Sequence, residues 1–208
     1  MPLQNRVAPD GSLHGVAARG LFMGNRGGRI HDPDTQTLTR RRWASKAWIC
    51  CVTSFKDRHR TVWGRSYTEL FFLDEVTALA AGHRPCFECR RHDAIGFAEA
   101  WARGQSKPGR ARAAAMDSTL HGERTALAHQ TLTFSQASSL PDGTVIAVDS
   151  RPFAVRNGEL LPWSFDFYGA PVRLPENAHL TLLTPPSIVD ALRAGYRPGW
   201  HESASTAG

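Results

Sequence analysis

Residues 76–89 read Val76-Thr-Ala-Leu-Ala-Ala-Gly-His-Arg-Pro-Cys86-Phe-Glu-Cys89, and this stretch guides the interpretation of the whole chain. A run of good helix formers ends at Gly82, a residue that readily takes the left-handed conformation found just after a helix. Asp74 stands where it can cap the start of that helix. Two cysteines separated by two residues can turn toward one metal ion at about 2.3 Å. The stretch therefore predicts a short helix followed by a metal-binding knuckle.

One such knuckle supplies only half of a tetrahedral zinc site, and the chain has two further cysteines, Cys50 and Cys51. They lie within residues 43–55, whose aromatic and β-branched side chains predict a strand, and residues 61–70 are expected to return as its hairpin partner. Adjacent residues on a regular strand point to opposite faces. We therefore expect one ligand and one core thiol from this pair, unless a bulge turns both inward and all four cysteines bind zinc.

The fourth ligand stays open if only three thiolates bind. His59 lies in a charged turn after the predicted strand, and His92 lies about one helical turn after Cys89. A histidine supplies a ring nitrogen that zinc accepts readily, and water is the other possibility.

Cysteine usage also depends on the compartment. No apolar run is long enough to span a bilayer, and residues 1–20 lack the apolar core of a secretory signal. We therefore expect a cytoplasmic protein with no membrane partner, in which thiols stay reduced and four cysteines are metal ligands or reactive groups rather than two disulfides. A redox pair and buried free thiols are the alternatives, although no thioredoxin-like βαβ pattern precedes the knuckle.

The net charge of +6 is concentrated in the first third of the chain. Residues 1–60 hold 11 Lys and Arg against 4 Asp and Glu, a balance of +7. Such asymmetry indicates a polyanionic partner, usually nucleic acid, and DNA is expected here; a solvated surface is the alternative. The expected phosphate contacts are Arg40, Arg41, Arg42, Lys46, Arg84, Arg90 and Arg91.

The remaining pattern predicts an α+β fold, in which a zinc-centred hairpin with helices is followed by a β-rich C-terminal region. Helices are expected over residues 89–103, 112–127 and 185–194, and short strands near 143–149, 152–156, 159–163 and 179–183. Asn157-Gly158 is a strong hairpin signal. We expect a zinc-binding region over residues 1–104, a helix with a small β-rich unit over 105–200, and a disordered tail over 201–208. The first two regions can equally form one compact domain.

An internal echo limits what the knuckle alone can prove. Residues 76–86 match residues 189–199 at seven of eleven positions, and the second copy has no cysteine. A helix ending in Ala-Gly-aromatic-Arg-Pro is thus partly a way to stop a helix. Only the cysteines of the first copy can carry metal chemistry.

Residues 72–90 resemble the zinc-binding region of Ada-type DNA methylphosphotriester repair domains, in which a short helix ends in Ala-Gly-aromatic-Arg-Pro-Cys-x-x-Cys. The resemblance is specific over about residues 70–92 and leaves the rest of the chain unassigned. It implies a four-thiolate zinc site in which Cys86 and Cys89 are the second pair. Cys50 and Cys51 stand where the first pair is expected, but they are adjacent, whereas the family separates that pair. The resemblance further implies that Cys51 or Cys50 accepts a methyl group from DNA.

Three functions stay open at this point. The first is a zinc protein that associates with nucleic acid, and the second is DNA repair by methyl transfer to a zinc-bound cysteine. The third is a structural-zinc or redox-sensing protein without a nucleic-acid partner. A zinc deaminase is disfavoured, because no His-x-Glu motif precedes Cys86.

Overall fold

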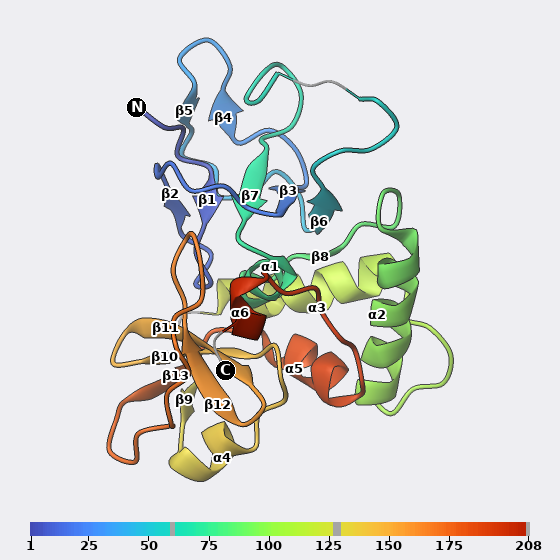
Figure 1. Ribbon diagram of the computed structural model, residues 1–208. Coiled ribbons are helices and arrows are strands. Elements are labelled where there is room, and N and C mark those ends of the chain that lie inside the picture. Colours follow the sequence, from blue (N-terminus) through green and yellow to red (C-terminus); the bar gives the residue numbers. More distant parts are fainter. Residues whose placement is uncertain (59–60, 127–129, 207–208) are drawn as a thin grey trace.

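The computed structural model describes residues 1–58, 61–126 and 130–206. Two β-sheets are connected by a group of helices, with the first sheet at the top of Figure 1 and the second at the lower left. This mixture of helices and sheets confirms the α+β class. Within the described residues, no helix is both long and apolar enough to cross a membrane.

The first sheet contains six short strands in the order β2-β1-β7-β3-β6-β8. Their bounds are β1 Arg6–Val7, β2 Leu13–His14, β3 Phe22–Arg26, β6 Trp48–Val52, β7 Leu70–Phe72 and β8 Arg84–Pro85. A separate two-stranded hairpin is formed by β4 His31–Asp32 and β5 Thr37–Leu38.

The predicted hairpin between residues 43–55 and 61–70 is wrong. Strand β6 pairs antiparallel with β3 and parallel with β8, so both of its edges are occupied by other strands. Gly24 lies inside β3, at the start of a glycine-rich stretch. A Cβ atom there would come within 2.1 Å of the Ile49 carbonyl oxygen and 2.9 Å of the Phe72 ring. The glycine permits close packing rather than a turn.

The second sheet has five strands in the order β12-β11-β10-β13-β9. Their bounds are β9 Thr131–Leu132, β10 Val145–Val148, β11 Arg151–Arg156, β12 Glu159–Pro162 and β13 Leu180–Leu182. Asn157 and Gly158 both take positive φ, 51° and 78°, in the turn between β11 and β12, as that dipeptide predicts.

The helices fill the space beside and between the sheets (Figure 1). Their bounds are α1 Glu75–Ala80, α2 Arg91–Gly104, α3 Ala113–Thr125, α4 Phe134–Ser138, α5 Pro186–Arg193 and α6 Ser203–Thr206. Helix α1 contributes Leu79 to the core shared by α2, α3 and α5, and Val76 to a core shared with the second sheet. Ala78 of the same helix packs in the core of the first sheet, so α1 connects that sheet to the rest of the fold.

The internal echo produces the same helix ending twice. After α1, Gly82 donates to the Leu79 carbonyl and His83 donates to the Ala78 carbonyl. After α5, the corresponding N–H groups of residues 195 and 196 donate to the carbonyls of residues 192 and 191. Both glycines have positive φ, 76° and 101°. The shared sequence therefore encodes a glycine-terminated helix end, independently of the cysteines.

The predicted disorder of the tail is wrong as far as residue 206. Ser203–Thr206 form helix α6, and Ala204 is 6% exposed in the core that includes Val76. The Ser203 hydroxyl accepts from the main-chain N–H of Tyr168. The His201 N–H donates to the Asp74 carboxylate, which also caps α1. These contacts with residues distant in the sequence order the segment 201–206, although its local composition is typical of disorder.

Candidate metal centre

The two adjacent cysteines of β6 point to opposite faces of the first sheet. The Cys50 side chain is completely buried, with Leu70, Phe72 and Ala78 in its core cluster. Cys51 is only partly buried and reaches the other face, toward the knuckle. The strand has no bulge here, because Gly24 and Met23 of β3 pair in register with Cys50 and Cys51. Ordinary strand alternation thus decides which thiol faces the knuckle.

The knuckle is attached to β6 through main-chain hydrogen bonds. Strand β8 lies parallel beside β6, and the chain leaves it at Cys86, whose N–H donates to the Cys50 carbonyl oxygen at 2.9 Å. The chain then turns so that the Glu88 N–H donates to the Cys86 sulfur at 3.4 Å. Cys89 completes the turn, and α2 begins two residues later at Arg91 rather than at residue 89 as the sequence predicts.

The sulfur atoms of Cys51, Cys86 and Cys89 all lie within 4.8 Å of one another. Four ligands at about 2.3 Å from a tetrahedral zinc ion have sulfur–sulfur distances of about 3.8 Å. A contraction of about an ångström at most would therefore bring the three sulfurs to metal-binding distances. None of the three cysteines is in a disulfide. These cysteines could hold a metal ion.

The pKa values of the cysteine thiols are shifted in different directions. The pKa of Cys86 is lowered because its sulfur accepts hydrogen bonds from the thiols of Cys51 and then Cys89, and from main-chain N–H groups. The pKa of Cys51 is raised, because its thiol donates to the sulfurs of Cys86 and Cys89 and because it is largely buried. Cys86 is thus the first thiolate of the group, and a cation would favour ionisation of all three.

The predicted role of Cys50 as a ligand does not fit this geometry. Its sulfur is outside the group of three and instead lies 3.4 Å from an Arg90 guanidinium nitrogen. Complete burial raises the pKa of the Cys50 thiol, with a smaller opposing effect from Arg90. Of the two strand cysteines, only Cys51 therefore groups with Cys86 and Cys89, and the Cys50 thiol lies in the core without access to solvent.

His92, one of the two candidates for a fourth ligand, is not part of the group of three cysteines. Its side chain is fully exposed, and its Nδ1 lies 3.8 Å from an Asp93 carboxylate oxygen. His59 lies outside the described residues. A hollow lies beside the three cysteines, with Asn25, Phe55 and Tyr67 in its wall. Arg58 and Glu88, whose side chains form an ion pair at 2.6 Å, also line it.

Two of the predicted phosphate-binding arginines are buried and paired instead. Arg84 makes two hydrogen bonds of 2.8 Å to the Asp117 carboxylate. Arg90 contacts the carboxylates of Glu75 at 2.7 Å and Asp93 at 2.8 Å. Both arginines are 6% exposed or less, so they hold the knuckle against the helices and cannot meet a phosphate. Their place beside the cysteines in the sequence made them look like surface cations.

Glu75 is a positioning residue that the sequence analysis missed. Besides Arg90, its carboxylate accepts from the Tyr196 hydroxyl at 2.6 Å and the Gly199 N–H at 2.8 Å. The Tyr196 hydroxyl and the Gly199 N–H, both from the second copy of the echoed sequence, thus stabilise the Glu75 carboxylate in α1. The partners are more than 100 residues away along the chain, and only the register of the echo could have indicated them.

The other predicted phosphate contacts are exposed. Arg91 starts α2 next to the knuckle, and the other four lie in the loop between β5 and β6. That loop, residues 39–47, is called the basic loop below, and its cations are Arg40, Arg41, Arg42 and Lys46. Among the described residues, none of these five side chains forms an ion pair.

Comparisons of the chain with protein-family models, with curated proteins and with solved structures found no match.

Proposed function

We propose that this protein binds one zinc ion through Cys51, Cys86 and Cys89 and associates with nucleic acid, most naturally DNA, through the basic loop. The observation that carries the proposal is the convergence of three thiols from β6 and the knuckle within 4.8 Å. Sequence-distant cysteines that meet without forming a disulfide are typical of a metal site in a reducing compartment.

Zinc is the metal best suited to this donor set. Thiolates are soft ligands, and zinc accepts them in tetrahedral geometry without any redox chemistry. The bound ion would connect β6 to the turn before α2, adding to the main-chain bond between Cys86 and Cys50. Its role in this proposal is to hold the first sheet against α2.

The nucleic-acid part of the proposal is supported by the basic loop. Its four cations are exposed and unpaired in the described residues, so no internal ion pair must be broken when they meet phosphates. Each phosphate contact on B-DNA contributes a slope of about −0.9 to log K against log salt. Binding through three or four of these side chains should therefore be moderate in strength and strongly dependent on salt.

Fluorescence anisotropy with a short duplex tests this at several salt concentrations. Replacing Arg40, Arg41 and Arg42 together by Gln should weaken binding at least tenfold and reduce the salt slope by about 2–3. The matched control replaces Lys107, Arg110 and Arg112, three exposed cations between α2 and α3, and should leave both quantities nearly unchanged. Equal losses in the two variants would show nonspecific attraction only. No binding by the wild type at low salt would remove nucleic acid from the proposal.

Methyl transfer to Cys51 is a second candidate, supported by the hollow beside the three cysteines. Cys51 is partly exposed and lines this hollow, so a methyl group could approach its sulfur there. In such a step, the thiolate sulfur would form a bond to the methyl carbon while the bond from that carbon to a phosphotriester oxygen breaks and leaves a phosphodiester. Incubation with a methylphosphotriester duplex should add one methyl mass to the wild type and none to Cys51→Ser. An unmodified zinc-loaded wild type would exclude this candidate.

A further inference from the structure

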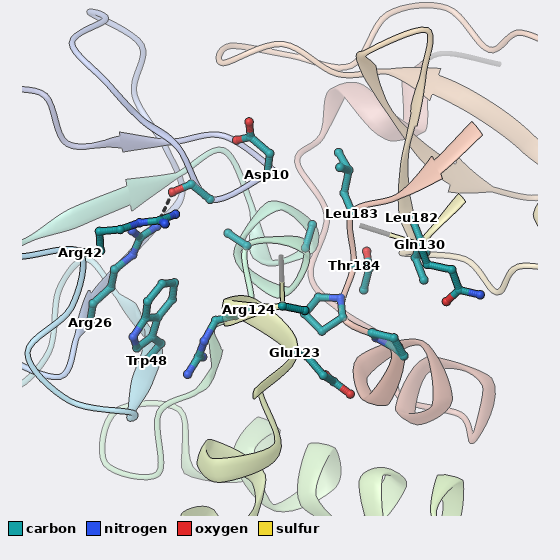
Figure 2. Close-up of a pocket in the computed structure, with 16 residues that line it drawn as sticks. Asp10, Arg26, Arg42, Trp48, Glu123, Arg124, Gln130, Leu182, Leu183 and Thr184 are labelled. Atoms are coloured by element: carbon teal, nitrogen blue, oxygen red, sulfur yellow. Dashed lines mark hydrogen bonds between the residues drawn. The ribbon is translucent and has the colours of Figure 1, made fainter. Parts of the chain in front are cut away.

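A second site lies away from the cysteines, in a cavity of about 210 Å³ between the two sheets. Figure 2 shows Arg26, Arg42 and Trp48 along one side and Leu182, Leu183 and Thr184 along the other, with Arg124 between them. The cavity is thus built from β3, the basic loop, β6, the end of α3 and the segment before α5. It is smaller than the roughly 300 Å³ at which sites for drug-sized ligands begin, so it suits a compact ligand.

Arg26 is buried in this wall without a negative partner. Arg26 is 4% exposed. Among the described residues, no carboxylate lies within ion-pair distance of its guanidinium group. One terminal nitrogen donates to the Gly11 carbonyl at 2.6 Å, and the buried Nε has no partner in the described residues. Burial, followed by the nearby charges of Arg124 and Arg42, lowers the pKa of Arg26 to about 9. An isolated buried cation is costly unless an anion joins it.

Arg124 repeats the pattern beside Trp48. The guanidinium carbons of Arg26 and Arg124 lie 4.1 and 4.2 Å from the Trp48 ring centroid, so both cations pack against the indole. Arg124 donates to the carbonyls of Gly82 and Lys46, and its buried Nε is also unpartnered in the described residues. The main-chain acceptors and the ring hold both guanidinium groups in fixed positions but do not neutralise their charge.

The two acidic residues of the cavity are engaged elsewhere. The Asp10 carboxylate accepts from the N–H and hydroxyl of Ser12. The Glu123 carboxylate accepts from the N–H and hydroxyl of Ser187, at 3.2 and 2.6 Å. Asp10 acts on Arg26 only from a distance, as a minor effect that raises the pKa of the arginine. Three cations therefore face the cavity without an ion pair to a carboxylate among the described residues, and Asp117 and Glu123 act on Arg124 only from a distance.

We infer that this cavity is a binding site for a phosphate group, held by Arg26, Arg42 and Arg124. A phosphate offers enough oxygens to accept from three guanidinium groups and carries up to two negative charges, whereas a carboxylate has only two oxygens. The group can come from a free phosphate ion or from the 5′-phosphate end of a nucleic-acid strand. This site goes beyond the proposed function, since it requires no metal and uses Arg42 as its only residue from the basic loop.

Calorimetric titration of the full-length protein at constant ionic strength tests the inference, with inorganic phosphate as the probe and chloride as the reference. A second arm compares a short oligonucleotide with and without a 5′-phosphate. Saturable binding of inorganic phosphate, or tighter binding of the phosphorylated oligonucleotide, is the expected result. Which probe binds more tightly identifies the source of the phosphate. Equal affinity for both oligonucleotides, together with no saturable phosphate binding, would overturn the inference.

Variants then assign the site. Arg26→Met should weaken binding of the preferred probe at least tenfold, while zinc content and binding of the unphosphorylated duplex stay unchanged. Arg42→Met serves as the second variant, because this exposed side chain can be replaced without disturbing the core. The control is Arg110→Met, since Arg110 is equally exposed but lies outside the basic loop and does not line the cavity. Equal losses in Arg110→Met and Arg42→Met, or full binding by a folded Arg26→Met, would contradict the assignment.

Discussion

The main-chain N–H of Cys86 donates to the carbonyl oxygen of Cys50 at 2.9 Å, although Cys50 is not part of the three-thiol group. This bond fixes the start of the knuckle beside β6. The next residue of that strand, Cys51, presents its sulfur to the knuckle from the opposite face. The two adjacent cysteines thus have different roles. Cys50 holds the knuckle through its backbone carbonyl and packs its side chain in the core, whereas Cys51 contributes its thiol to the group of three.

Removing a zinc ion bound as proposed should destabilise the protein. Zinc binding to preformed thiolates contributes to folding free energy, because the unfolded chain does not present the three ligands together. Treatment with a strong chelator should lower the Tm, by about 2–4 °C for each kcal/mol lost in a chain of this size. Differential scanning calorimetry before and after chelation, with zinc added back as the control, measures this. An unchanged Tm despite verified metal loss would mean that the ion does not support the fold.

Breaking the buried pair of Arg84 and Asp117 should cost much more than replacing it. Arg84→Met alone leaves a buried carboxylate without its two 2.8 Å hydrogen bonds, at an expected cost of about 3–5 kcal/mol. The double variant with Asp117→Leu should recover a large part of that loss, because no unpaired charge stays buried. Urea unfolding of both variants gives the comparison. A single variant within about 1 kcal/mol of the wild type would contradict the burial of this pair.

Gly24→Ala should destabilise the first sheet. Its methyl group would lie 2.1 Å from the Ile49 carbonyl oxygen, a contact with backbone that cannot move aside easily. Such overpacking typically costs about 1–3 kcal/mol, measurable by urea unfolding. Gly96→Ala is the matched control: this glycine lies inside α2, and outside its own helix backbone nothing comes within 4 Å of the added Cβ, so the change should stabilise by up to about 1 kcal/mol. Similar effects from both substitutions would contradict the position of β3 between its neighbours.

Deleting residues 201–208 should destabilise the protein, in contrast to the removal of a disordered tail. The deletion removes the buried Ala204 and the Ser203 hydroxyl that accepts from the Tyr168 N–H. Leaving one buried donor unpaired costs about 1–3 kcal/mol. Thermal unfolding should show a clear decrease in Tm. A truncated chain as stable as the full chain would show that α6 contributes nothing to the core.

Local signals in the sequence predicted the features that depend on a few neighbouring residues. The helix after Asp74, its ending at Gly82 and the turn at Asn157-Gly158 all follow from cap and turn chemistry, and the structure contains each of them. Strand alternation also predicted that Cys50 and Cys51 would diverge. The proximity of Cys51, Cys86 and Cys89 agrees with that reasoning, but which metal they bind stays a prediction.

Features that depend on distant contacts could not be predicted in this way. Strand β6 pairs with β3, and Gly24 of β3 is required by its close packing against Phe72. The residues next to Gly24 in the sequence do not indicate this contact. Arg84 and Arg90 looked like surface cations until Asp117 and Glu75, which come from other elements, were found to pair with them. Arg26 is the opposite case, since nothing in the sequence showed that it would be buried without a carboxylate.

The central claim, a zinc ion held by Cys51 but not Cys50, is tested most directly by elemental analysis of purified wild type, Cys51→Ser and Cys50→Ser. The account predicts one zinc per chain in the wild type, a large loss in Cys51→Ser, and full zinc content in folded Cys50→Ser. Cys86→Ser should behave as Cys51→Ser does. Absence of zinc from metal-replete wild type, or equal losses in the two β6 variants while Cys50→Ser stays folded, would contradict the account.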